Sequence, residues 1–287
     1  MRRSRVVFES EDHYVTGPSN PDDSGRAVYA RTNPVFGVLY AWRETVNLYL
    51  NAGQGFETPS FTELAYRPDG SAGLNFALRP AVSRHVETGL KAYAGPDTRI
   101  NAALFRVRTE DEIVSGPAAA PGRATFRNAE RTARDGMELS LEHRFGPELD
   151  VYFAGTLLDA RFEDYVSFSG TDLSGRALPG VPRTMLHGEL RWRLRSNVRT
   201  VLEARRVGAI PVDDANSDTA AAYTVINGRI GWEKTGRGWR VEPFLRLDNL
   251  LDKNYIGSVI VNANNGAYFE PVPRRQYTLG LQARFEL

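Results

Sequence analysis

The last stretch of the chain, QYTLGLQARFEL (276–287), decides the fold class. Apolar or aromatic side chains occupy every second position from Tyr277 to Leu287, and polar residues or glycine occupy the positions between them. A period of two places these two sets on opposite faces of a β-strand. Its 12 residues are long enough for a tilted strand to cross a bilayer.

Segment 182–194 repeats the pattern and shows what lies on the second face. One face carries Thr184, Leu186, Gly188, Leu190, Trp192 and Leu194, and the other carries Arg183, His187, Glu189, Arg191 and Arg193. Charged side chains at this density are too costly for a dry core but suit a water-filled lumen. Comparable alternation, of varying clarity, predicts about twelve strands, the others lying near 3–11, 31–42, 46–52, 86–93, 98–112, 135–145, 148–159, 197–208, 222–234 and 239–252.

The connections between these segments alternate between short and long. The short turns are Trp42–Glu44, Gly95–Asp97, Gly146–Pro147, Arg195–Asn197 and Thr235–Gly238; the long loops are roughly 56–82, 113–132, 160–181, 209–221 and 254–275. An outer-membrane barrel has short periplasmic turns and long extracellular loops, whereas a soluble sandwich has no reason for this asymmetry. The pattern predicts an all-β, transmembrane, antiparallel up-and-down β-barrel.

Composition is compatible with a membrane barrel and excludes several other classes. Mean hydropathy is −0.39, because only one face of each strand meets lipid. The net charge of +1 gives no field that would attract nucleic acid. Cysteine is absent, which excludes zinc ribbons and thiol chemistry.

Three stretches resemble the β-barrel domain of TonB-dependent outer-membrane receptors of the siderophore type. They are NAGQGFETPSFTEL (51–64), LDNLLDKNY (247–255) and PRRQYTLGL (273–281), with weaker similarity in GMEL (136–139) and LPGVPR (178–183). The residues that carry the resemblance are Gly55, Phe56, Pro59, Glu63, Leu64, Asn249, Leu250, Asp252, Tyr255, Pro273, Arg274, Tyr277, Gly280 and Phe285. Their expected role is architectural, at strand ends, rather than ligand contact.

The chemistry of these motif residues predicts the structural role of each one. We expect Asn249 and Asp252 to close turns with their side chains, and Tyr255 to lie at the membrane interface with a hydrated hydroxyl. Pro273 would prevent early extension of the last strand, and Arg274 with Arg275 would reach lipopolysaccharide or carboxylates of the outer rim. Gly280 would face inward, where a larger side chain would collide with whatever fills the lumen.

The resemblance implies a function and a set of partners. Such receptors use the TonB complex to import a ferric siderophore or similar cargo across the outer membrane of a Gram-negative bacterium, and the barrel-assembly machinery inserts them beside lipopolysaccharide. They have a plug domain and a 22-stranded barrel. We therefore expect residues 1–287 to be the C-terminal portion of such a barrel domain, without plug domain or signal peptide, and Met1 to start at the level of a periplasmic turn. The family usually ends on an aromatic residue, whereas here Phe285 precedes the terminal Leu287.

No pattern in the sequence indicates catalysis, a cofactor or a bound metal. The histidines His13, His85, His143 and His187 lack a serine motif to serve, and His85 and His187 are expected to point inward. Two acidic groups allow a Ca²⁺ site, although a solvated rim is the commoner role: Glu110, Asp111 and Glu112, and Asp213, Asp214 and Asp218. Loop residues that are candidates for cargo contact are Tyr66, Arg67, Arg79, Tyr165, Phe168, Tyr268 and Phe269.

Two other functions remain open at the level of sequence. An even number of strands also permits a self-sufficient twelve-stranded pore. A soluble β-sheet binding module or hydrolase would show the same period-two alternation. The identity of the cargo is not readable from these residues.

Overall fold

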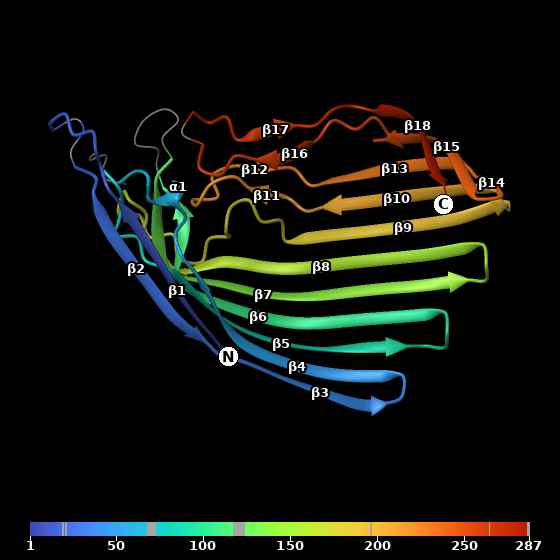
Figure 1. Ribbon diagram of the computed structural model, residues 1–287, viewed down its shortest axis with the longest axis horizontal. Coiled ribbons are helices and arrows are strands. Elements are labelled where there is room, and N and C mark those ends of the chain that lie inside the picture. The colour runs from blue at the N-terminus through green and yellow to red at the C-terminus, as the bar shows by residue number, and fades with distance from the viewer. Residues whose placement is uncertain are drawn as a thin grey trace.

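A computed structural model describes residues 1–18, 20, 22–67, 73–116, 124–195, 197–263 and 265–285. One curved antiparallel sheet forms most of the molecule, as Figure 1 shows. Its strands, in spatial order, are β3 (Val35–Arg43), β4 (Val46–Glu57), β5 (Ala81–Tyr93), β6 (Thr98–Ser115), β7 (Phe126–Phe145), β8 (Leu149–Asp164), β9 (Thr184–Arg195), β10 (Val198–Val207), β13 (Tyr223–Trp232), β15 (Trp239–Asp248) and β18 (Gln276–Phe285). Neighbours in the sheet are neighbours in the sequence, which is up-and-down barrel topology.

The remaining elements lie mostly at the loop edge of the sheet, and all of them except β1 and β2 are short. They are the hairpins β1 (Arg2–Ser10) with β2 (Gly25–Asn33), β11 (Ile210–Pro211) with β12 (Thr219–Ala220), and β16 (Ile256–Val259) with β17 (Phe269–Pro271), together with β14 (Lys234–Gly236) beside β15 and the helix α1 (Phe61–Leu64). Among the described residues, no helix has the length and apolar character needed to cross a membrane.

All the short turns lie at one edge of the sheet and the long loops at the other (Figure 1). Gly95, Gly146 and Gly238 adopt positive φ angles of 73°, 63° and 73° in three of these turns, which glycine reaches without steric cost. The predicted one-sided arrangement of turns and loops is confirmed. In the predicted turn Arg195–Asn197, Ser196 lies outside the described residues, as do Glu286 and Leu287 of the last strand.

The central strands are longer than the sequence indicated. β6, β7 and β8 have 18, 20 and 16 residues, so the predicted loops 113–132 and 160–181 are wrong in extent. Charged side chains near the loop ends had blurred the apolar period. These ends remain paired, from Arg131 opposite Asp164 to Ser115 opposite Phe126, because a strand pair continues beyond the lipid wherever its ladder still has a partner.

The start of the chain also differs from expectation. Arg2 pairs with Asn33, the last residue of β2, and only after Pro34 does β3 run on to Arg43 at the edge of the short turns. Met1 therefore lies at mid-height and not at the level of a periplasmic turn, as the label N in Figure 1 shows. The single strand predicted near 31–42 is therefore wrong: two strands cover this region, because Pro34 separates β2, which begins at Gly25, from β3.

The outward face of the sheet is apolar over a band of limited height. The register aligns one row of exposed side chains across three strands, namely Leu104, Met137 and Leu157, which are 58%, 45% and 47% exposed. The next outward-facing row toward the loops is charged and consists of Arg106, Asp135 and Asp159. The outer boundary of the apolar band falls between these two rows.

Aromatic side chains mark the opposite boundary, close to the short turns. Phe145, Trp192 and Trp232 are 56%, 50% and 48% exposed on the outward face. From Met137 to Phe145 the strand rises by roughly 27 Å at ~3.4 Å per residue, and a tilt of about 40° reduces this to a height of ~20 Å. This height and its aromatic edge are those of the lipid-facing band of a membrane barrel.

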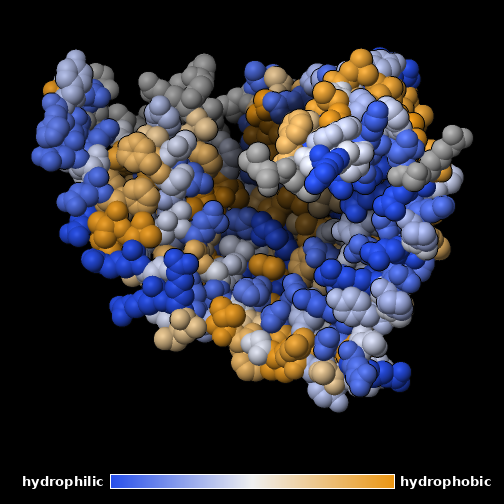
Figure 2. Space-filling model, turned by 45° about the vertical axis from the view of Figure 1, so that its right-hand side comes forward, coloured by the Kyte–Doolittle hydropathy of each residue, from blue (hydrophilic) through white to orange (hydrophobic). Residues whose placement is uncertain are grey.

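The inward face is charged, as the pattern in segment 182–194 predicted, but Arg183, which was expected on this face, pairs at 3.3 Å with Asp159 of the outward-facing row. Ion pairs join Arg229 to Glu242 at 2.7 Å and Arg199 to Glu233 at 2.8 Å. Figure 2 shows a hollow in which many hydrophilic residues lie. His187 contacts Tyr152 with ring centroids 5.9 Å apart, on the same inward face as Glu189, Arg191 and Arg193.

Inward-facing aromatic rings cover glycines of the neighbouring strand. Phe244 lies opposite Gly280, as Phe105 lies opposite Gly136, and a Cβ atom at either glycine would overlap the ring. Gly280 therefore faces inward as predicted, but the group that a larger side chain would meet is Phe244 in the adjacent strand.

We expect Gly280→Val to lower the free energy of unfolding by about 1–3 kcal/mol, because the added side chain must displace the Phe244 ring. The measurement is the urea midpoint in lipid vesicles. Gly188→Val is the matched control, since a Cβ atom at Gly188 has no neighbour within 4 Å. Equal destabilisation by the two variants would contradict this account, and Phe244→Ala should restore part of the loss in Gly280→Val.

Candidate functional site

A cavity of about 440 Å³ lies among the long loops at the outer edge of the sheet. Four chain segments meet there: the ends of β6 and β7, the loop between β8 and β9, the loop between β10 and β13, and the loop between β15 and β18. Its lining includes Ser115, Arg127, Tyr165, Ser167, Phe168, Ser169, Thr171, Leu173, Asp213, Asp214, Asn262 and Tyr268. This volume is in the range of small-molecule sites.

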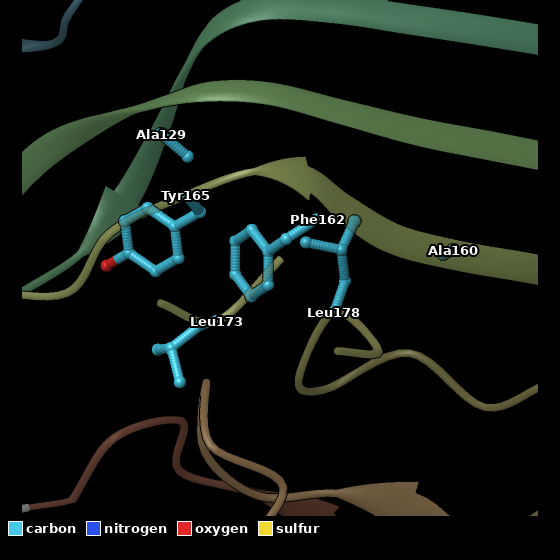
Figure 3. Close-up of a cluster of buried hydrophobic side chains, with 6 residues drawn as sticks. All are labelled: Ala129, Ala160, Phe162, Tyr165, Leu173 and Leu178. Carbon is cyan, nitrogen blue, oxygen red and sulfur yellow. The ribbon is translucent and has the colours of Figure 1, made fainter. Parts of the chain in front are cut away.

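Tyr165 is held rigidly in the wall of this cavity by a hydrophobic cluster. It follows the last residue of β8, is 2% exposed, and stacks on Phe162 with ring centroids 4.5 Å apart. Leu173 and Leu178 from the following loop complete the cluster, as Figure 3 shows. The loop therefore folds back onto the end of its own strand, because this buries four large apolar side chains.

The hydroxyl group of Tyr165 connects the cluster to a buried carboxylate. It donates a hydrogen bond to Oδ2 of Asp214 at 3.1 Å, and Nδ2 of Asn262 donates to Oδ1 at 3.0 Å. Burial raises the pKa of Asp214, although both hydrogen bonds oppose this. Burial and the nearby Asp214 also raise the pKa of Tyr165, so its hydroxyl stays protonated and available as a donor.

Asn262 joins three of the four segments. Besides its bond to Asp214, the side-chain Nδ2 of Asn262 donates to the carbonyl of Ser115 at 3.0 Å. The side-chain Oδ1 accepts from the amide of Asp214 at 3.1 Å. The backbone amide of Asn262 donates to the carbonyl of Val212 at 3.0 Å. Its φ angle is 55°, a left-handed conformation that asparagine tolerates better than most residues. The geometry of the cavity therefore depends on this residue.

The cavity can bind a ligand but contains no catalytic arrangement among its described residues. Arg127 is the single cation of the described lining; its guanidinium lies 5.2 Å from the centre of the Tyr165 ring and donates to the carbonyl of Val166 at 2.8 Å. Hydroxyl groups of Ser167, Ser169 and Thr171 form a polar edge. Aromatic surface, hydroxyl groups and one cation suit recognition of a small molecule.

The cavity contains three of the seven loop candidates for cargo contact. Tyr165, Phe168 and Tyr268 line it together, although 103 positions separate the first from the last. The others lie elsewhere: Arg79 pairs with Asp111 at 2.7 Å, and Arg67 donates to the carbonyl of Leu74. Phe269 borders Tyr268 edge-on without lining the cavity, and Tyr66 is not among the lining residues.

Sequence reasoning missed Arg127 and Asn262. Arg127 lies inside the predicted loop 113–132, and no pattern in the sequence sets it apart from the other arginines. Asn262 lies in the run VNANNG (261–266), and asparagine with glycine favours the left-handed conformation that Asn262 adopts. This run predicts a tight turn, but nothing in it predicts the hydrogen bonds between Asn262 and Asp214.

The two acidic groups do not converge on a metal. Glu110, Asp111 and Glu112 pair with Arg84, Arg79 and Arg134, one arginine to each carboxylate. Asp213 accepts hydrogen bonds from Ser217, and Asp214 from Tyr165 and Asn262. Among the described residues, no cluster of three or more His, Cys, Asp or Glu side chains is arranged to hold a metal ion.

Gly55 and Phe56 of the first motif lie just before the end of β4 at Glu57, and Pro59 follows in the connection to α1. Ser60 caps α1: its hydroxyl accepts from the amide of Glu63, whose carboxylate accepts from the amide of Ser60 at 2.6 Å. Leu64 is 1% exposed. This capping box was readable as Ser-x-x-Glu, but the one-turn helix was not predicted.

The second and third motifs contact each other at the loop ends of β15 and β18. The side chain of Asn249 closes the turn by two hydrogen bonds to the backbone of Lys253, as expected. Asp252 accepts from the amide of Arg275 at 3.0 Å and from the Arg274 guanidinium, and these contacts lower its pKa. Arg274 was expected to reach either lipopolysaccharide or a carboxylate of the outer rim, and in the structure it contacts a carboxylate, that of Asp252.

The other motif residues take positions at strand ends and on the outer wall. Leu250 donates its amide to the carbonyl of Ile226, and Tyr255 stacks on Tyr223 with centroids 4.2 Å apart, inside a packed loop cluster. Pro273 precedes β18. Tyr277 and Phe285 are 64% and 70% exposed on the outward face of β18.

The fold and the site together define a class of protein. A curved antiparallel wall with an apolar outer band, a charged inner face and a ligand-sized cavity among long loops is the architecture of a membrane β-barrel wall with a binding site at one end. The chain belongs to the TonB-dependent receptor β-barrel family, since the family model described as "TonB dependent receptor-like, beta-barrel" matches residues 2–250. Members of this family are outer-membrane receptors and transporters of Gram-negative bacteria.

Two curated relatives are similar over part of their length. The ferrioxamine B receptor of Salmonella typhimurium is 22% identical over 238 residues, 81% of this chain and 31% of the relative. The vitamin B12 transporter BtuB of Vibrio vulnificus is 27% identical over 134 residues, 44% of this chain and 21% of the relative. The chain therefore spans less than a third of the length of these relatives.

Solved structures share the fold. The copper transporter OprC superposes with a TM-score of 0.77 at 17% identity, covering 99% of this chain and 44% of OprC. The siderophore receptor PiuA of Acinetobacter baumannii gives 0.73 at 15% identity, covering 98% of this chain and 39% of PiuA.

Proposed function

We propose that this chain is the C-terminal portion of the barrel of a TonB-dependent receptor in the outer membrane of a Gram-negative bacterium, and that the receptor imports a ferric siderophore or a similar metal chelate. The match of the family model over residues 2–250 supports the proposal most strongly. The ferrioxamine B receptor and PiuA, both similar to this chain, are named for siderophores.

In the complete receptor, we assign one set of roles to this chain and another to the rest of the protein. Residues 1–287 supply the wall and the outer loops, whereas a plug domain and the segment that engages the TonB complex belong to the rest of the protein. The hydrophilic inner face can accommodate a plug, and the outer face would lie in lipid and lipopolysaccharide after insertion by the barrel-assembly machinery.

Within this proposal, the loop cavity contacts the cargo. Phe168 is 60% exposed and borders the cavity with Tyr268, so both present aromatic surface to an incoming ligand. Arg127 places one positive charge beside that surface. Contact with two aromatic rings and a guanidinium would orient a chelate at the mouth of the barrel.

The test measures binding and TonB-dependent uptake of ⁵⁵Fe-loaded ferrioxamine B and ferric citrate, with vitamin B12 and copper(II) as alternative cargo, in cells producing the complete receptor. We expect Tyr268→Ala to weaken binding of the transported cargo about tenfold, which corresponds to ~1.4 kcal/mol. Phe269→Ala is the matched control, because Phe269 is the adjacent aromatic residue and does not line the cavity.

Two outcomes would overturn the proposal. Equal loss of binding in the Tyr268 and Phe269 variants would remove the cavity from cargo recognition. Uptake that persists without TonB, or the absence of uptake of every cargo tested, would remove the receptor function.

A further inference from the structure

The charged groups of the loop cavity do not give it a positive lining. Arg127 is the single cation among its described lining residues, and Asp213 and Asp214 are the carboxylates there. One guanidinium against two ionised carboxylates gives a net charge of −1, and protonation of Asp214, the direction in which burial shifts its pKa, gives zero. In neither state does the lining attract a polyanion.

The guanidinium of Arg127 is already engaged within the protein. It donates to the carbonyl of Val166 at 2.8 Å, and it lies 5.2 Å from the centre of the Tyr165 ring. It is also close enough to Asp214 for its positive charge to lower the pKa of that carboxyl, against the effect of burial. A guanidinium shared among a carbonyl, a ring and a carboxylate has few donors left for the oxygens of an anionic ligand.

Asp213 is the carboxylate of the lining that the protein leaves without a cation. Its side chain is half-buried in the cavity wall and accepts hydrogen bonds from the amide of Ser217 at 2.8 Å and from the Ser217 hydroxyl. None of the ion pairs in the described part of the chain includes Asp213. Its negative charge therefore favours a cationic ligand group and disfavours an anionic one.

The uncharged part of the lining favours the same class of ligand. Phe168 is 60% exposed and Tyr268 is half-buried, and the faces of aromatic rings attract cations. The hydroxyl groups of Ser167, Ser169 and Thr171 form a chain with distances of 2.9 and 3.2 Å. Hydroxyl groups both donate and accept, so they can bind neutral amide and hydroxamate groups.

We propose that the loop cavity selects metal chelates without net negative charge, of the ferric hydroxamate class, and discriminates against anionic chelates such as catecholates. A cationic or neutral arm of the chelate would lie between the rings of Phe168 and Tyr268 and the carboxylate of Asp213. The inference rests on the proposed receptor function and deepens it, because it assigns the charge of the cargo.

The experiment compares chelates that share one metal centre and differ in the charge of one arm. The probes are ferrioxamine B with its ammonium arm, its neutral N-acetyl derivative and its N-succinyl derivative, which ends in a carboxylate; ferric enterobactin is the polyanionic catecholate. Quenching of tryptophan fluorescence in the purified complete receptor, at low ionic strength, measures each Kd. We expect the ammonium form to bind about tenfold more tightly than the succinyl form, the acetyl form to lie between them, and ferric enterobactin to bind most weakly.

Two variants of opposite charge test whether the cavity causes this preference. We expect Asp213→Asn to reduce the ratio of the two affinities severalfold and Arg127→Gln to increase it, and a general loosening of the cavity would not give opposite shifts. Each variant retains a readout if the other fails to fold. Asp218→Asn is the matched control, because Asp218 lies in the same loop, is exposed and does not line the cavity.

Equal affinity for the three ferrioxamine forms, tighter binding of the succinyl form or of ferric enterobactin, or equal ratios in the Asp213 and Asp218 variants would each overturn the charge preference. Uptake separates this failure from failure of the proposed function. TonB-dependent import of all the probes alike would leave the receptor function intact and remove the preference, whereas absence of binding and import of every probe would remove both.

Discussion

Leu139→Arg is expected to destabilise the protein in a lipid bilayer by about 2 kcal/mol, because an arginine on the lipid-facing wall of a barrel costs roughly 2–4 kcal/mol at the bilayer midplane and less toward the interface. Leu139 is 41% exposed on the outward face of β7, one outward position below Met137. Its exposure to solvent in the isolated molecule becomes exposure to hydrocarbon in the membrane. Urea unfolding of the receptor in phospholipid vesicles measures the change.

The neighbouring residue provides the control. Glu138 points to the inward face, where water and other charged side chains stabilise an ionised group. We expect Glu138→Arg to cost less than about 1 kcal/mol, although it changes the net charge by two units instead of one. A larger effect of Glu138→Arg than of Leu139→Arg would reverse the assigned faces of the wall.

The second large effect is expected at Asn262. Asn262→Ala removes three side-chain hydrogen bonds and places alanine at a φ angle of 55°. At about 1 kcal/mol for each hydrogen bond, the loop cavity should lose ~3 kcal/mol of local stability. Protection of the Asp214 amide from hydrogen exchange should therefore fall by about two orders of magnitude, because this amide donates to Oδ1 of Asn262.

Two glycine variants separate the loss of the Asn262 side-chain hydrogen bonds from the backbone strain of alanine at a positive φ angle. Asn262→Gly tolerates the left-handed backbone, so any loss of protection reports the side chain alone. Asn249→Gly removes a comparable asparagine with a φ angle of 54°, whose side chain bonds only within its own turn among the contacts described. Protection of the Asp214 amide that survives Asn262→Gly, or that is lost equally in Asn249→Gly, would refute the bridging role of Asn262.

Local sequence predicted the membrane wall well, because each strand carries its own signal. The alternation in segment 182–194 placed Leu190 outward and Arg191 inward without reference to any partner strand. The short turns were equally readable, since glycine at positive φ serves a tight turn whatever surrounds it. The family motifs added the class of protein.

Prediction was poorer where the chain leaves the membrane. Above the apolar band, side chains on both faces meet water, so the period of two fades and the strand ends of β6 and β7 read as loop. Their ladder continues because partners such as Ser115 and Phe126 are available in the neighbouring strand. The same loss of pattern hid the mid-height start of β1 opposite Asn33.

The sequence by itself determined the all-β class, the faces of the strands, the side of the long loops and the family, because these depend on residues a few positions apart. Only the tertiary structure decided that Tyr165, Phe168 and Tyr268 form one cavity, that Asn262 holds it together, and that three arginines surround Asp135 on the outer wall. These groups come from segments far apart in the chain or from several strands. Their proximity follows from the curvature and register of the sheet, which no local pattern encodes.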